Sequence, residues 1–202
     1  GNENGIIIAL DADCTVKCNY LTVISSFFTL HPDLNGASIH FEHPLENLDK
    51  DVQKGIVQYE LHLRYYNQLL RYAGHPFAYH TVGSSMAVKA SAYIKQGGMN
   101  KRKAGEDFYF LQKIIQLGKF GEIKDTCVYP SARISSRVPF GTGRAMGDWI
   151  NNDIKELQSY HPMVANELKL LIEALLLKKG SLSIGDIPLS IIAFLGKVLW
   201  ED

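Results

Sequence analysis

Gly5-Ile6-Ile7-Ile8-Ala9-Leu10-Asp11-Ala12-Asp13 is the stretch of sequence that decides the fold. Its apolar run is β-branched at the start and lies between a glycine and an aspartate, which is typical of a strand buried on both faces of a sheet. Two carboxylates follow, at positions 11 and 13. Ligands of α/β sheets bind beyond the carboxyl ends of strands, although aspartate is also common in plain turns. The pair therefore predicts either a binding site or an ordinary turn.

Helical and extended patterns alternate after this strand. In residues 51–72, apolar side chains recur at spacings of three and four, which is typical of a helix with one buried face. Similar patterns predict helices at 19–30, 91–96 and 106–117, and strands at 37–41, 77–82 and 122–129. A glycine-rich stretch at 139–147 precedes three amphipathic segments, at 148–160, 163–178 and 188–200. The sequence thus predicts an α/β domain over 1–147 and a helical extension over 148–202.

Charge and composition exclude several classes of protein. The 202 residues hold 21 Lys+Arg and 21 Asp+Glu, so the formal net charge is zero and no nucleic-acid partner is expected. Three cysteines, Cys14, Cys18 and Cys127, are too few for a disulfide framework and predict reduced thiols in the cytoplasm. We see no signal peptide and no transmembrane segment. A peripheral contact of residues 189–200 with the inner face of the membrane is kept as an alternative.

Two acidic pairs and one glycine-rich loop contain the candidate reactive residues. Asp11 and Asp13 offer hard oxygen ligands for Mg²⁺ or Mn²⁺, with phosphate oxygens completing the coordination shell. Glu106 and Asp107 head a predicted helix, where a carboxylate either caps the helix or takes part in catalysis. Residues 139–144 form either a phosphate-binding loop, with arginines as donors, or an interdomain connection.

Four pieces of the chain together resemble family-2 glycosyltransferases of the GT-A type. In order, they are Leu10-Asp11-Ala12-Asp13, Gly83-Ser84-Ser85-Met86-Ala87, Gly97-Gly98-Met99-Asn100 and Gly105-Glu106-Asp107-Phe108. The resemblance covers roughly residues 5–145 and implies a partial GT-A domain, similar to nucleotide-diphospho-sugar transferases, with a C-terminal helical tail. It also implies inverting transfer of a sugar, most commonly from a UDP-sugar, to a sugar or lipid-linked acceptor.

The resemblance assigns roles to particular residues. Asp13, helped by Asp11, would hold the Mn²⁺ or Mg²⁺ that stabilises the leaving nucleotide. Asp107 would be the general base, and Glu106 would position it or contact the acceptor. The acceptor side would be lined by Gly83, Ser84 and Ser85, with His80 as either a contact or a packed side chain. From the chemistry of phosphate recognition, Arg137 or Arg144 would stabilise the diphosphate.

One departure and two alternatives accompany this interpretation. Family members carry a nucleotide-binding segment before the D-x-D strand, so we expect this chain to be a truncated piece with little or no transfer activity. Asp11-Ala12-Asp13-Cys14-Thr15-Val16 also matches the first motif of haloacid dehalogenase-like phosphatases, in which Asp11 would be the nucleophile and Mg²⁺ the cofactor. Alternatively, the C-terminal helices form a non-catalytic docking module.

Overall fold

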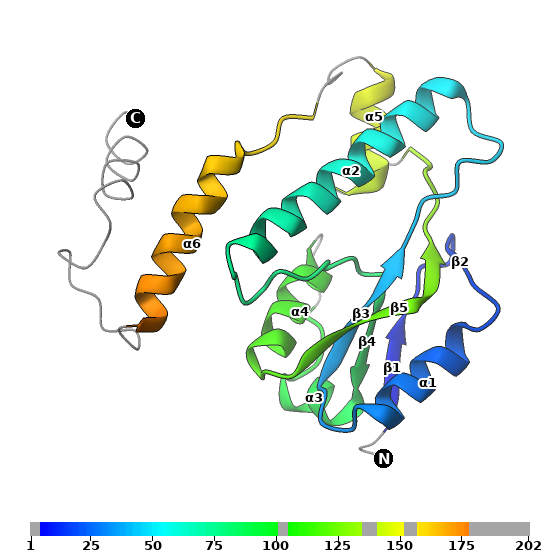
Figure 1. Ribbon diagram of the computed structural model, residues 1–202. Coiled ribbons are helices and arrows are strands. Elements are labelled where there is room, and N and C mark those ends of the chain that lie inside the picture. Colours follow the sequence, from blue (N-terminus) through cyan, green and yellow to red (C-terminus); the bar gives the residue numbers. More distant parts are fainter. Residues whose placement is uncertain (1–4, 101–104, 135–140, 152–156, 178–202) are drawn as a thin grey trace. The chain divides into compact units, whose positions relative to one another are not determined.

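The computed structural model describes residues 5–100, 105–134, 141–151 and 157–177, and these form a mixed α/β structure (Figure 1). Two compact units are present. The first contains the described residues of Gly1–Leu61 and Tyr79–Leu157, and the second those of His62–Ala78 and Gln158–Asp202. All the strands of the described chain belong to the first unit.

In the described part of the first unit, five strands form one sheet in the order β1-β4-β3-β5-β2. Their bounds are Ile6–Ala9 (β1), Thr15–Val16 (β2), Gly36–Phe41 (β3), Met86–Lys89 (β4) and Phe120–Tyr129 (β5). β4 is antiparallel to both β1 and β3, and β3 is parallel to β5, so β1, β3 and β5 all run the same way. The carboxyl ends of these three strands and the start of β4 therefore lie at the same end of the sheet (Figure 1). We call this row of strand ends the carboxyl edge.

The described residues contain six helices. Their bounds are Tyr20–Leu30 (α1), Lys50–Tyr72 (α2), Ala90–Lys95 (α3), Glu106–Gln116 (α4), Thr142–Ile150 (α5) and Pro162–Leu177 (α6). Successive residues of a strand point to opposite faces of the sheet. Phe27 of α1 contacts Gly121 of β5, whereas Ile114 of α4 lies against Gly36, beside Phe120. Helices α1 and α4 therefore cover opposite faces of the sheet.

The first strand departs from its sequence prediction. A strand buried on both faces was expected, but β1 is at the end of the strand order and pairs only with β4 among the described strands. The side chains of Ile7 and Leu10 are 38% and 45% exposed. An apolar β-branched run favours an extended backbone. How many strands pair with it depends on segments far away in the sequence, and the run itself holds no information about them.

Two other elements lie elsewhere than expected. Residues 77–82 form no strand; instead the chain turns at 82–85, where the Ser85 N–H donates to the Val82 carbonyl at 2.9 Å, and β4 follows. The helix expected over 148–160 begins at Thr142, within the glycine-rich stretch, and ends at Ile150. Glycine was taken as a sign of a loop there, but Trp149 of α5 lies directly against Gly55 of α2. The other predicted strands and helices that the structure describes are confirmed within two residues or so of their bounds.

The described part of the second unit contains the end of α2, the turn after it, and α6. The Tyr65 hydroxyl donates to the Tyr160 carbonyl at 2.9 Å, and the Tyr72 hydroxyl donates to Asn166 Oδ1 at 2.9 Å. Lys169 lies over the Tyr72 ring, 5.0 Å from its centroid. The segment 188–200, predicted as a helix, lies outside the described residues. None of the described helices combines the length and apolarity that crossing a membrane requires.

Candidate functional site

The two aspartates of the D-x-D motif lie in a tight turn at the carboxyl edge. The turn is closed by the Cys14 N–H, which donates to the Asp11 carbonyl at 3.0 Å. Asp11 and Asp13 are exposed, and their carboxylate oxygens lie with Cys14 Sγ within 4.8 Å of one another. The turn thus presents two hard oxygen donors to solvent in the arrangement that a divalent cation can use.

Arg133 is a partner of this turn that the sequence did not assign to it. The Arg133 guanidinium Nε donates to Asp13 Oδ2 at 2.5 Å. Arg133 follows β5 and Asp13 follows β1, and both strands end at the carboxyl edge. Arg133 precedes the glycine-rich stretch at 139–147, and its 120-residue separation from Asp13 leaves no local signal of this pairing in the sequence. The topology therefore adds a positive charge to the acidic turn.

Gly83, Ser84 and Ser85 form the turn that leads into β4, next to the D-x-D turn. Ser84 and Ser85 are buried, and no partner for the Ser85 hydroxyl is present among the described residues. Burial raises the pKa of the Cys14 thiol, a hydrogen bond from Ser84 lowers it, and the charges of Asp11 and Asp13 raise it further. The Cys14–Ser84 contact links the two turns.

Asp107 lies directly against Gly83. A Cβ atom on Gly83 would be 2.7 Å from Asp107 Oδ2 and 3.1 Å from Asp107 Cβ, so only glycine allows this approach. The Gly83 N–H donates to the Asp107 carboxylate, and the Phe108 N–H donates to Asp107 Oδ1 at 2.7 Å. The structure therefore brings together two of the predicted pieces, the glycine-serine turn and the acidic pair.

Burial makes the Asp107 carboxyl a weaker acid than usual. Desolvation raises its pKa most, and the charge of Glu106 raises it further. The hydrogen bonds from the Phe108 and Gly83 amides lower it, but the net shift is upward. The start of α4 holds this geometry because Gly105, the residue before the helix, has the left-handed backbone that glycine adopts without strain (φ 72°). A half-buried carboxylate with a raised pKa is a candidate for a proton-transfer role.

The remaining predicted residues lie in other surroundings. Glu106 lines a hollow of about 150 Å³ along α4, together with Gly98 and Asn100. The His80 ring stacks edge-on against Phe41, with centroids 5.3 Å apart. Arg144 Nε donates to Asp148 Oδ2 at 2.9 Å, one turn further along α5. Arg137 lies outside the described residues.

Comparison of the chain with protein-family models and with curated proteins found no match. The chemistry of the chain is therefore inferred from the geometry of the carboxyl edge. That edge combines an exposed pair of carboxylates, one arginine, a turn of two buried serines, and a half-buried carboxylate whose pKa is raised. Such an arrangement suits two tasks at once, cation or phosphate binding and removal of a proton from a hydroxyl group.

Proposed function

We propose that the chain is part of an inverting glycosyltransferase that moves a sugar from a nucleoside-diphosphate sugar to an acceptor hydroxyl. The single observation that carries the proposal is the contact of Asp107 with Gly83, because it joins a candidate base to the turn proposed to line the acceptor. The Cys14–Ser84 hydrogen bond extends this contact to the D-x-D turn. Donor-side and acceptor-side groups thus belong to one connected set of side chains.

Asp11 and Asp13 are the residues that would hold Mn²⁺ or Mg²⁺. Their oxygens lie within 4.8 Å of each other and are exposed, and carboxylate is the donor that these cations prefer. The ion, when bound, supplies Lewis acidity to the leaving diphosphate. Arg133 offers guanidinium N–H groups beside the same turn, which favours binding of phosphate oxygens.

Asp107 would accept the proton of the acceptor hydroxyl as the new glycosidic bond forms. Its raised pKa makes it a better proton acceptor than an ordinary aspartate. Glu106, the residue before Asp107, would position the base or contact the acceptor, although the hollow it lines along α4 does not include Asp107. The amide of Gly83 keeps the Asp107 side chain in place, so the base does not depend on the acceptor for its position.

The test uses the product of the complete reading frame that encodes this chain. Release of UDP from a panel of UDP-sugars is measured with Mn²⁺ and a mixture of sugar and lipid-linked acceptors. Asp107→Asn is expected to lower kcat by about 10²- to 10⁴-fold, the usual contribution of a general base. Asp33→Asn serves as the control, since Asp33 precedes β3 and pairs with Lys119. Near wild-type transfer by a folded Asp107→Asn variant would show that the assignment is wrong.

A further inference from the structure

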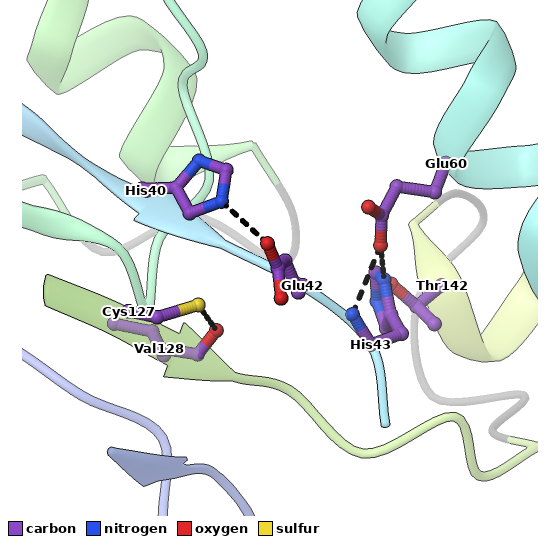
Figure 2. A network of polar contacts seen from close by, with 7 residues as sticks. All are labelled: His40, Glu42, His43, Glu60, Cys127, Val128 and Thr142. Atoms are coloured by element: carbon purple, nitrogen blue, oxygen red, sulfur yellow. Dashed lines mark hydrogen bonds and ion pairs between the residues drawn. The ribbon is translucent and has the colours of Figure 1, made fainter. Parts of the chain in front are cut away.

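A second group of metal-ligating side chains lies between β3 and β5, and the proposed sugar transfer does not use it. His40 and Glu42 are two positions apart at the end of β3, and so point to the same face of the sheet. Phe41 between them pairs with Val128 of β5, which places the preceding residue, Cys127, on the face of His40 and Glu42. Figure 2 shows these three side chains converging across the two strands.

The distances within this group are close to those of a coordination shell. His40 Nε2 donates to Glu42 Oε1 at 2.9 Å, and the three ligand atoms all lie within 4.8 Å of one another. From the usual Zn–N, Zn–O and Zn–S bond lengths, a tetrahedral ion separates its ligand atoms by about 3.3 to 3.6 Å. Small side-chain rotations therefore suffice to close the shell, with no movement of the strands.

A break in the strand pairing accompanies the group. The register of β3 against β5 shifts between Ile39 and Phe41, whose partners are Ile123 and Val128. Bulges of this kind re-aim side chains and are common beside functional sites. Here the break is immediately next to His40, and it brings the buried Cys127, 4% exposed, opposite a histidine and a carboxylate that solvent reaches. An ion can thus enter from the Glu42 side.

We propose that His40, Glu42 and Cys127 bind one Zn²⁺ ion, with the fourth coordination position taken by water. An imidazole nitrogen, a thiolate and a carboxylate form a borderline-soft donor set, which Zn²⁺ prefers and Mg²⁺ does not. The D-x-D turn differs in this respect, because its two best-exposed donors are hard oxygens. The zinc site is therefore distinct from the cation site of the proposed transferase. Its test does not depend on whether the transferase proposal is correct.

Metal binding would remove the thiol proton of Cys127. Without an ion, the Cys127 thiol donates to the Val128 carbonyl at 3.3 Å (Figure 2). Burial raises the pKa of this thiol to about 11, and the charge of Glu42 adds to the rise, so the thiol keeps its proton at neutral pH. Zn²⁺ forms a bond to sulfur while the S–H bond breaks and its proton passes to solvent. The ion also supplies the positive charge that offsets Glu42 and the thiolate.

Cobalt titration of the full chain under a thiol-free reductant tests the proposal. Co²⁺ bound to a thiolate gives a ligand-to-metal charge-transfer absorption band, which Zn²⁺ abolishes by displacement. We expect this band in the wild type, its loss in Cys127→Ser, and an affinity for Co²⁺ weakened at least roughly 10-fold in Glu42→Gln and His40→Gln. Glu42 is half-exposed, so its variant reports on binding even if Cys127→Ser does not fold.

Two further variants separate this site from the rest of the chain. Cys18→Ser, at an exposed thiol outside both candidate groups, should leave the band unchanged. Cys14→Ser should also leave it unchanged, because Cys14 belongs with Asp11 and Asp13. A band that is absent from the wild type overturns the proposal. A band that survives in folded Cys127→Ser and disappears in Cys14→Ser also overturns the proposal.

Discussion

The candidate base Asp107 depends on the absence of a Cβ atom at position 83. Gly83→Ala would place a Cβ 2.7 Å from Asp107 Oδ2, so the Asp107 side chain must rotate away and lose its bond from the Gly83 amide. We expect the transfer rate of the complete enzyme to fall at least tenfold, and the free energy of unfolding to fall by about 1 to 3 kcal/mol.

Transfer assays and urea unfolding measure these two effects of Gly83→Ala. Gly147→Ala is the matched control, because a Cβ there would be 3.4 Å from Ile134, an ordinary contact, within helix α5. That substitution should leave the transfer rate unchanged and add up to about 1 kcal/mol of helix propensity. Full activity in Gly83→Ala would mean that Asp107 is not held by this glycine.

The raised pKa of Asp107 predicts a pH-dependent cost to folding. Its folded-state pKa lies above the ordinary 3.8, so the native state binds more protons than the unfolded state between the two values. The contribution of Asp107 to stability is thus fully present below about pH 3.8 and is lost as the pH rises through the folded-state pKa. The unfolding free energy of wild type minus that of Asp107→Asn should therefore decrease with rising pH.

Urea unfolding over a pH series checks this prediction, and Asp33→Asn provides a control of opposite sign. Hydrogen bonding and Lys119 lower the pKa of the exposed Asp33 carboxyl, so its contribution is present above pH 3.8 and is lost as the pH falls. The wild-type-minus-variant difference for Asp33 should therefore increase with pH. If the wild-type-minus-variant difference for Asp107 also increased with pH, burial would not be the main influence on the pKa of Asp107.

At the scale of elements, helix α5 shows how a local pattern can mislead. Its glycines predicted a loop, yet the segment packs on α2, where Met146 joins Ile56 and Ala132 in a buried cluster. The nearby Gly55 provides the space for the Trp149 ring. Helix α4 and strand β5 were predicted well because their apolar spacing and glycine boundaries are local signals. Glycines that serve helix packing look the same in sequence as glycines that break helices.

The Gly55–Trp149 contact gives a prediction at this scale. A Cβ on Gly55 would be 2.7 Å from Trp149 Cδ1 and Cγ, so Gly55→Ala should destabilise the first unit by about 1 to 3 kcal/mol, despite the better helix propensity of alanine. Urea unfolding followed by circular dichroism measures the change. In a Trp149→Ala background the same substitution should be neutral or stabilising. Equal destabilisation in both backgrounds would rule out the ring as the cause.

At the scale of the whole molecule, strand order decides which residues meet. The sequence predicted the D-x-D turn, the serine turn and the acidic pair as separate pieces, because each is a local motif. It did not predict that Asp13 pairs with Arg133, or that Cys127 lies opposite His40. Those pairs depend on β5 lying beside β3 and on the break in its register, which follow from packing of the entire sheet.

A phosphatase assay distinguishes the two enzymatic hypotheses for the D-x-D motif. In the phosphatase reading Asp11 attacks phosphorus and Asp13 donates a proton to the leaving group. Asp13 Oδ2, however, accepts a hydrogen bond from the Arg133 guanidinium, so this side chain is already engaged by a neighbouring cation. Under the transferase proposal, the chain with Mg²⁺ should release no p-nitrophenol from p-nitrophenyl phosphate, and Asp11→Asn should match the wild type. Turnover that Asp11→Asn abolishes would instead establish Asp11 as a nucleophile and remove the basis for assigning Asp107 as the base.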